Sequence, residues 1–224
     1  MDVDSFWEYS DPAGSEARFR AALESAKGDE RLELVTQVAR TYSLRKDFAK
    51  AHALLDEVEA ALPRAGMRPR LRYLLERGRS FNSAGEKERA REHFQQAWAL
   101  GSGSGEEGLA VDAAHMVAIT FQGTPEAIDW NVRGLAMARD SKAAKAQALI
   151  PAMHNNVAWD LHDMGRHEEA LRAFETALEE WSARGRPKQV QVAKWSVAQC
   201  LRSLGRHDEA QVIEKALEAE GFKP

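Results

Sequence analysis

Five alanines recur along the chain at nearly constant spacing, and this repeat constrains the fold more than any other feature of the sequence. Successive members lie 39, 37, 43 and 40 residues apart. Self-similarity at a period of 20–50 residues is the signature of repeat architectures, in which one structural unit is stacked several times. The five positions are Ala51, Ala90, Ala127, Ala170 and Ala210.

A second column of mostly small residues lies twelve positions before these alanines. Small side chains at fixed positions allow two helices to cross closely, and the larger apolar residues between them interlock the helices. This alternation is typical of a helical solenoid. The column contains Ala39, Gly78, His115, Ala158 and Ala198.

Helical periodicity runs through nearly the whole chain, whereas strand signals are almost absent. In one segment, Leu32, Val35, Ala39 and Tyr42 recur at three- and four-residue spacing, which places them on one helix face. Short turn-forming stretches such as NSAGE and DMGRHE separate the periodic segments. We therefore predict an all-α fold, a right-handed superhelical solenoid of antiparallel helix pairs with about eleven helices.

At the level of single residues the repeats resemble the tetratricopeptide repeat. The segment 158–178, AWDLHDMGRHEEALRAFETAL, has that family's small residues at helix crossings, its turn glycine and its aromatic residue in the second helix. The unit 109–139 departs from the pattern, because His115 replaces a small residue and the turn lacks its glycine. The period near 40 exceeds the family's usual length of about 34, so each helix is expected to carry about one extra turn. The remaining units that fit are 39–63, 78–97 and, in its first half, 198–217.

The resemblance covers about residues 30 to 221 and implies five repeats within residues 29–224. Residues 12–27, with Phe19, Ala22 and Leu23, look like a capping helix or a half repeat. We therefore expect residues 1–28 to form an N-terminal segment and a capping helix, in one continuous domain with the repeats.

Two nearly identical heptapeptides, MGRHEEA at 164–170 and LGRHDEA at 204–210, have a structural explanation in this scheme. Gly165 and Gly205 end the first helix of a pair, where a left-handed residue is needed. The acids that follow open the second helix, where they suit the positive end of its dipole. His167 and His207 are expected to pack beside the turns. The alternative is a metal ion shared by the two turns, which we rank far lower.

Composition and motifs argue against catalysis and against a membrane-spanning protein. The net charge is −4, and the single cysteine, Cys200, excludes an intramolecular disulfide. The N-terminus has no basic and apolar regions like those of a secretory signal, and no stretch is long and apolar enough to span a bilayer. No metalloprotease, phosphate-loop or dinucleotide motif is present. We expect a cytoplasmic protein with no catalytic residue, cofactor or metal.

The resemblance implies a concave groove lined by the first helix of each pair. In the family, this groove binds extended peptides or a helix of a partner, so we expect a protein or peptide partner of unknown identity. The positions that would line the groove and bind a partner here are Arg40, Arg72, Arg79, Asn82, Asn155, Asn156, Trp159, His162, Trp195, Gln199 and Arg202.

Two groups of groove residues each allow two interpretations. Segment 64–79 holds six arginines and one acid, Glu76, which fits either a solvated helix face or recognition of carboxylate or phosphate groups. Trp159 and Trp195 either fill a gap between repeats or serve as binding anchors. Arg79 and Trp159 each follow a small crossing residue, so we expect both to face the groove and not to be needed for the core.

The function predicted from these features is a non-catalytic scaffold or adaptor for protein–protein interaction. An alternative is a regulatory protein of the same repeat type that senses a ligand or peptide. Binding of RNA by a helical repeat ranks lower, because the charge is basic only in the second repeat. Membrane binding is not expected and nucleic acid is an improbable partner. Apolar residues Ile213, Leu217 and Phe222 also suggest a homodimer through the C-terminal repeat.

Overall fold

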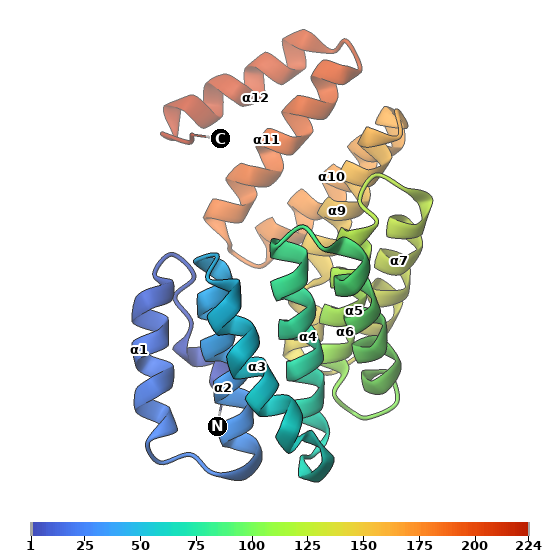
Figure 1. Cartoon of the computed structure of the whole chain (residues 1–224). Coiled ribbons are helices and arrows are strands. Elements are labelled where there is room, and N and C mark those ends of the chain that lie inside the picture. Colours follow the sequence, from blue (N-terminus) through green and yellow to red (C-terminus); the bar gives the residue numbers. More distant parts are fainter. Residues whose placement is uncertain (1, 224) are drawn as a thin grey trace. The chain divides into compact units, whose positions relative to one another are not determined.

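Every long element of the described chain is an α-helix. The structure is a computed structural model and describes residues 2–223. Eleven helices have 12 or more residues, as predicted, and residues 2–223 contain no strand (Figure 1). In chain order the elements are η1 (Val3–Phe6), α1 (Pro12–Leu23), α2 (Gly28–Leu44), α3 (Phe48–Ala61), η2 (Leu62–Arg64), α4 (Met67–Ser83), α5 (Lys87–Gly101), α6 (Glu107–Thr120), α7 (Pro125–Asp140), α8 (Ala144–Gln147), α9 (Ile150–Asp163), α10 (His167–Ala183), α11 (Pro187–Ser203) and α12 (His207–Ala219).

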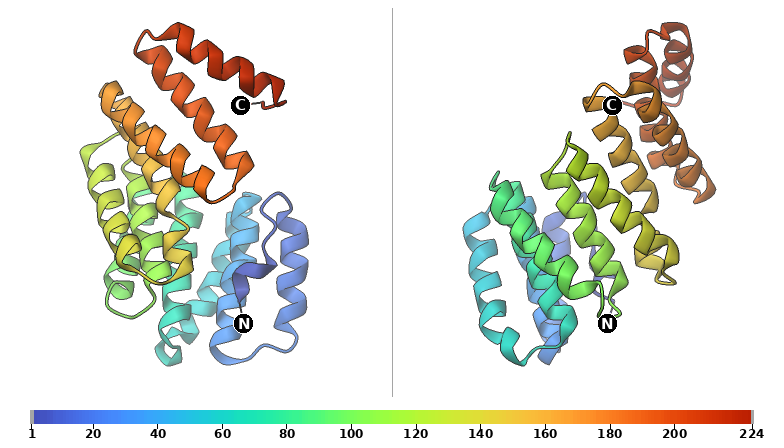
Figure 2. Two further views of the ribbon diagram at one scale, coloured as in Figure 1. Left: turned by 180° about the vertical axis from the view of Figure 1, so that it is seen from behind. Right: turned by 90° about the vertical axis from the view of Figure 1, so that its right-hand side faces the viewer.

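The chain consists of two compact units, residues 1–120 and 121–224, which we call unit 1 and unit 2. In unit 1, α2 packs against α1, α3 and α4, and α5 packs between α4 and α6. In unit 2, α9 packs against α7 and α10, and α11 packs against α10 and α12. Within each unit, helices joined by short turns run antiparallel, as the views in Figures 1 and 2 show. The boundary between the units falls inside the third predicted repeat, between α6 and α7.

The alanine column lies in the core of the units, as predicted. Ala51, Ala90, Ala127, Ala170 and Ala210 are all 0% exposed. Each lies in the first turn of the second helix of a pair, where a larger side chain would push the two helices of the repeat apart.

Close helix crossings explain the second column of small residues. Ala39, Ala158 and Ala198 are fully buried. A Cβ atom built on Gly78 of α4 would lie 2.5 Å from the Cε1 atom of Phe94 on α5, well inside contact distance. The absence of a side chain at Gly78 therefore lets the fully buried Phe94 ring sit directly against the α4 backbone.

Left-handed residues end the first helices, as predicted for the two similar heptapeptides. Gly165 and Gly205 both have a φ of 75°. At the first of these turns, the amide of Gly165 donates to the carbonyl of His162 and the amide of Arg166 donates to the carbonyl of Leu161, each at 2.9 Å. The first repeat has no glycine in this turn, and Lys46 takes the same conformation with a φ of 62°. These hydrogen bonds satisfy the last carbonyls of the helix.

The third repeat differs from the expected turn. The expectation that it lacks a turn glycine is wrong, because Gly123 adopts a φ of 79° one residue closer to the alanine column than in the other repeats. In unit 2, the amide of Gly123 donates to the Oδ1 atom of Asp160 at 2.8 Å. Ala114 is fully buried while the neighbouring His115 is half-buried, so the small crossing residue is displaced by one position.

Helix α1 and the residues before it precede the repeats. Helix α1 begins at Pro12 after Asp11, whose side chain accepts a hydrogen bond from the amide of Gly14. Phe19 of α1 is fully buried in a cluster with Val3, Leu34 and others. Residues from the stretch 2–9 also take part in this cluster, which the sequence pattern did not predict.

Candidate binding surfaces

The residues predicted to line the groove divide between the two units. Arg40 lies on α2, and Arg72, Arg79 and Asn82 lie on α4, all in unit 1. The other seven lie in unit 2, on the first helix of the last two repeats. They are Asn155, Asn156, Trp159 and His162 on α9, and Trp195, Gln199 and Arg202 on α11.

Arg79 is an internal ion-pair partner, which corrects the expectation that it is dispensable for the core. Its side chain is only 13% exposed, and its Nη2 atom donates to both carboxylate oxygens of Asp112 at 2.6 and 2.5 Å. Its Nη1 atom donates to Glu76 at 2.8 Å. Burial raises the pKa of Asp112, but the Arg79 charge and hydrogen bonds outweigh burial, and the net pKa lies below the usual value.

Arg40 and Arg72 are also paired with carboxylates of the same chain. Arg40 donates to Oε2 of Glu76 at 3.1 Å. The Arg72 side chain is 6% exposed and its Nη2 atom donates to both oxygens of Asp4 at 2.9 and 3.0 Å. Glu33 lies farther from Arg72, with its Oε2 atom 3.8 Å from Nε. The predicted basic face is therefore neutralised by carboxylates within unit 1.

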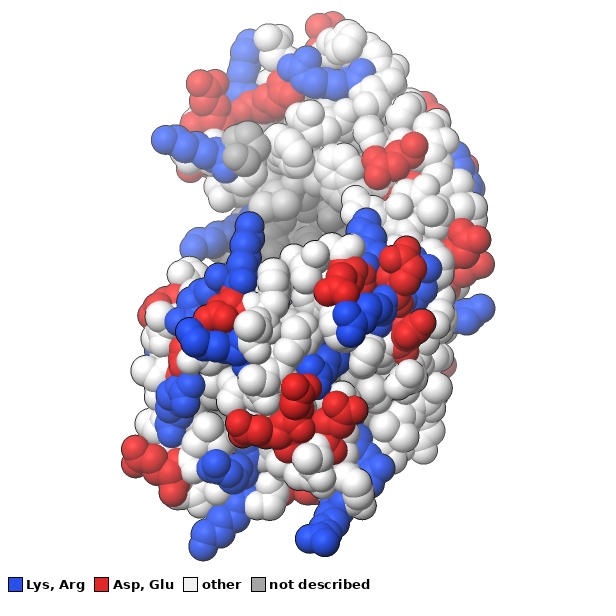
Figure 3. Space-filling model, viewed as in Figure 1, with Lys and Arg blue, Asp and Glu red and all other residues white. Residues whose placement is uncertain are grey.

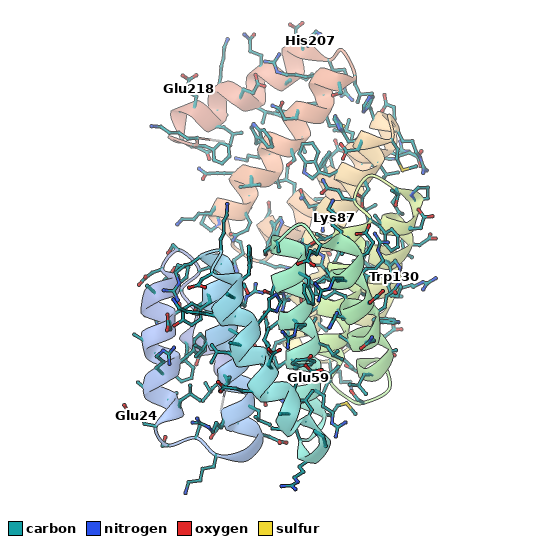
Figure 4. The ribbon with its side chains drawn as sticks, in the orientation of Figure 1. Glu24, Glu59, Lys87, Trp130, His207 and Glu218 are labelled. Carbon is teal, nitrogen blue, oxygen red and sulfur yellow. The ribbon has the colours of Figure 1, made fainter. Side chains whose placement is uncertain are left out.

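Other arginines of the same segment follow this pattern. Arg77 pairs with Asp56 and with Glu59, which Figure 4 labels on α3, and Arg68 pairs with Glu33. On the face of unit 1 seen in Figure 3, basic and acidic side chains are interspersed. A continuous basic surface, as nucleic-acid binding requires, is therefore not found on this face.

Asn82, the last of the unit 1 positions, has a buried side-chain oxygen. Within the described residues, its Oδ1 atom has no hydrogen-bond partner. Asn82 lies near the C-terminal end of α4, one residue after the buried ring of Phe81.

Residues 2–9 of unit 1, which we call the N-terminal segment, cover part of the predicted groove face. Besides the pair between Asp4 and Arg72, the Nε1 atom of Trp7 donates to Oε1 of Gln37 on α2 at 2.9 Å. The Arg40 guanidinium lies 5.8 Å from the ring centroids of both Trp7 and Tyr9. One signal for this contact was visible in the sequence, namely an acid and an aromatic residue, Asp4 and Trp7, three positions apart in a polar stretch.

Three aromatic side chains gather in unit 2, and we call Trp159, His162 and Trp195 the aromatic cluster. The Trp159 ring centroid lies 5.4 Å from that of His162 and 6.0 Å from that of Trp195. The Trp159 ring also packs edge-on against the fully buried Phe174, at 5.0 Å. All three members of the cluster are half-buried. Trp159 thus contacts the core, which corrects the expectation that the core does not need it.

His162 links the aromatic cluster to the repeated heptapeptide. Its Nε2 atom lies 2.8 Å from Oγ of Ser203, and its ring centroid lies 4.8 Å from that of His167. His167 therefore packs beside the turn, as predicted. The Nδ1 atoms of His162 and His167 are buried without a hydrogen-bond partner in the described part of the chain.

The remaining unit 2 positions provide a polar margin around the aromatic cluster. Asn155, Asn156 and Gln199 are half-buried. Arg202 is exposed and forms a fork-shaped ion pair with Glu214 of α12, so it too is paired within the chain. Near this margin, Cys200 is fully buried, its Sγ atom donates to the His167 carbonyl at 3.2 Å, and burial raises the pKa of its thiol to about 11. A thiol in this state is unreactive at neutral pH.

No metal centre or membrane span is found among the described residues. Within residues 2–223, no group of three or more histidine, cysteine, aspartate or glutamate side chains is placed to hold an ion. No helix within that range is long and apolar enough to cross a membrane.

Comparison with known families agrees with this architecture. Residues 149–218 match the sequence model of a family described as tetratricopeptide repeat. This segment spans α9 to α11 and most of α12. The match covers this part of unit 2 and agrees with the helix-pair fold seen there. Comparison with curated proteins gave no match.

Several solved structures share the fold. BtubC (BKLC) from P. vanneervenii is 15% identical, with a TM-score of 0.72 over 100% of this chain and 94% of that chain. The TPR-like repeats of a putative kinesin light chain from Podosopora anserina are 19% identical, with a TM-score of 0.69 over 87% of this chain and 96% of that chain. NprR in complex with its cognate peptide NprX is 13% identical, with a TM-score of 0.59 over 96% of this chain and 68% of that chain. At these identities the likeness shows the fold alone, a helical solenoid of tetratricopeptide type.

Proposed function

We propose that this protein is a non-catalytic adaptor that binds a protein partner, as a peptide or a helix, through the aromatic cluster of unit 2. The fold supports this role, because proteins of this repeat type are typically interaction scaffolds. The absence of catalytic motifs in the sequence is consistent with a binding role. We expect it to act in the cytoplasm.

The observation that carries the proposal is the pairing of Trp159 and Trp195 on neighbouring first helices, α9 and α11. Both side chains are half-buried, so each is partly packed against the chain and partly accessible to solvent. Tryptophan held in this way is enriched among the residues that dominate interface energies. His162, half-buried and in ring contact with Trp159, adds a polar side chain to the cluster.

The arginines of unit 1 contribute less to the proposed partner-binding surface than the sequence suggested. Arg40, Arg72 and Arg79 each hold a carboxylate of their own chain. A partner that engaged these arginines without supplying a carboxylate of its own would leave a buried charge uncompensated. The partner surface is therefore assigned to the aromatic cluster and its polar margin, Asn155, Asn156, Gln199 and Arg202.

Substitution of Trp195 tests this assignment. Trp159 is a poorer choice, because it packs against Phe174 and its loss would also disturb the core. For a partner isolated with the intact protein, Trp195→Ala should weaken binding by about 2 kcal/mol or more. The matched control is Trp130→Ala on α7, outside the aromatic cluster (Figure 4). Equal binding by the Trp195 and Trp130 variants would refute the assignment.

A second candidate function is peptide sensing, in which a bound peptide regulates the protein. The observation that favours it is the fold shared with NprR, whose structure holds its cognate peptide. A sensor should respond to its peptide beyond the contact site, so hydrogen exchange should slow in helices that the peptide does not touch. Protection confined to α9 and α11 would support the simple adaptor instead.

We also propose a homodimer through the C-terminal repeat, although this repeat exposes less apolar surface than the sequence suggested. Leu217 is only 3% exposed and Ile213 packs against the core of unit 2, so both are already covered within the chain. Val212, 69% exposed, is the large apolar side chain left open on α12. Sedimentation at high concentration distinguishes a dimer from a simple cap.

A further inference from the structure

The N-terminal segment lies on the face of α2 opposite α3. Figure 1 shows α3 in front of α2, and Figure 2, seen from behind, shows the N-terminal segment in front of α2. The segment also reaches α4, because Asp4 contacts Arg72. It therefore covers the two first helices of unit 1 whose side chains were predicted to bind a partner.

The first chemical group that this face of α2 and α4 binds is a carboxylate. Arg72 is nearly buried, and Asp4 is the carboxylate that accepts its hydrogen bonds at 2.9 and 3.0 Å. Glu33 is the other acid near this guanidinium, at 3.8 Å. A buried guanidinium requires a paired carboxylate. The face therefore selects an acidic residue at this position.

The second chemical group that this face binds is an indole ring. The Gln37 amide is 1% exposed, and its Nε2 atom is held by Oγ1 of Thr36 at 3.1 Å and by Glu76 at 3.4 Å. These contacts fix Oε1 as an acceptor that faces the segment, and Trp7 Nε1 donates to it at 2.9 Å. The Arg40 guanidinium lies within cation–π distance of the same ring.

A single turn of 3-10 helix sets the spacing between these two groups. The amide of Trp7 donates to the carbonyl of Asp4 at 3.3 Å, which brings the two side chains to the same side of the turn. The segment's contacts with α2 and α4 are thus made by its side chains. Its described backbone bonds to long helices go to α1 instead. Nε of Arg18 donates to the Phe6 carbonyl, the Glu8 amide donates to Oγ of Ser15, and that hydroxyl donates to the Glu8 carbonyl. Recognition by side chains at a fixed spacing is what a peptide from another chain can reproduce.

We propose that this face of α2 and α4 is a binding site for an acidic–aromatic peptide of a partner protein, with an aspartate three residues before a tryptophan. The chain's own residues 2–9 occupy the site in cis, and a partner peptide binds by displacing them. The site belongs to unit 1 and goes beyond the function proposed for the aromatic cluster of unit 2. A tethered segment competes at an effective concentration on the order of millimolar, so the intact chain binds such a peptide weakly.

The test uses the full chain and a labelled synthetic peptide of its own residues 2–10, DVDSFWEYS. Fluorescence anisotropy should show binding to the Asp4→Ala/Trp7→Ala variant that is at least tenfold tighter than binding to the intact chain. Adding Arg72→Gln to that variant should abolish the gain, whereas adding Arg64→Gln, an exposed arginine of the same basic segment, should not. A peptide with alanine in place of its tryptophan should not bind.

Loss of Trp7 also removes a contact with the buried Phe19, so folding needs its own control. The Asp4→Asn variant keeps every apolar contact of the segment and removes only the charge that Arg72 holds. The peptide should raise the melting temperature of this variant more than that of the intact chain, because a ligand that binds only the folded state stabilises it.

Four results would overturn the proposal. One is a folded double variant that does not bind the peptide. Another is equal binding by the intact chain and the variant, and the third is binding that Arg72→Gln leaves unchanged. A concentration-dependent dimer of the intact chain that the double variant loses would also overturn it, because a second copy would then be the occupant. Binding of the Trp195→Ala protein to a unit 2 partner is a separate readout, so either site can fail alone.

Discussion

Arg79 of α4 and Asp112 of α6 meet through two hydrogen bonds of 2.6 and 2.5 Å in unit 1, and Glu76 accepts a third bond from the same guanidinium. The Glu76 side chain is 1% exposed and that of Asp112 is 19% exposed. Arg79 thus bridges two acids that the fold removes from water, and Arg40 provides a second cation for Glu76.

The first prediction concerns this ion pair. Arg79→Ala should lower the free energy of unfolding by about 3–5 kcal/mol, because it leaves Asp112 without its cation and Glu76 with Arg40 alone. Chemical denaturation measures the change. Arg64→Ala, at an exposed arginine, is the control and should change stability by less than about 0.5 kcal/mol. Equal free energies of unfolding for the two variants would show that the ion pair adds nothing to the stability of the fold.

The second prediction concerns the left-handed turn residues. Gly165→Ala should cost about 1 kcal/mol, because φ is 75° and no atom lies within 4 Å of the added Cβ, so the cost is backbone strain alone. Lys46→Gly, at the equivalent turn with a φ of 62°, should stabilise the protein by about 0.5–1 kcal/mol. Thermal melting of the two variants should shift in opposite directions, and shifts of the same sign would contradict the turn assignment.

The third prediction concerns the close crossing of α4 and α5. Gly78→Ala should destabilise unit 1 by about 1–3 kcal/mol, because the added methyl group overlaps the ring of Phe94. Gly103→Ala, where no atom lies within 4 Å of the new Cβ, is the control and should be nearly neutral. Urea denaturation separates the two outcomes. A neutral Gly78→Ala would mean that the helices do not cross at this distance.

The fourth prediction concerns the buried Asp160 in unit 2. Burial raises the pKa of its carboxyl, and the hydrogen bond from the Gly123 amide only partly opposes this. The folded state thus holds the proton more tightly than the unfolded state does. The stability that this group contributes is present below the unfolded pKa near 4 and is lost as pH rises through the higher folded pKa.

Asp160→Asn removes the buried charge and keeps an oxygen that accepts the Gly123 bond. The variant should match the parent near pH 4 and exceed its stability at pH 7 by up to about 1 kcal/mol. Melting curves across this range measure the difference, with the exposed Asp129→Asn as control. A variant less stable than the parent at pH 7 would show that the charged form is the one the fold requires.

Features repeated along the chain were predictable from the sequence. The alanine column and the turn glycines are set by local geometry, so each of the five repeats gave independent evidence for the same helix pair. The third repeat was predicted less well, because Gly123 shifts its turn by one residue and the column at His115 no longer marks the crossing.

Pairings between distant residues were not predictable. Arg72 meets Asp4 across 68 positions, and Arg79 meets Asp112 across 33. The repeat pattern around these arginines does not indicate which acid each one contacts. The six arginines of segment 64–79 therefore looked like an open basic face, whereas the folded chain uses several of them to hold its own carboxylates.

The measurement that tests the central claim most directly is photo-crosslinking from Gln199. This residue lies four positions after Trp195 on α11 and is half-buried at the margin of the aromatic cluster. A photoreactive amino acid at position 199 should crosslink the chain to a partner protein in the source cell, and Trp195→Ala should abolish the product. The control is the same group at the exposed Glu218 of α12, labelled in Figure 4. Crosslinks from position 218 but not from position 199, or crosslinks from 199 that survive Trp195→Ala, would contradict a partner site at the aromatic cluster.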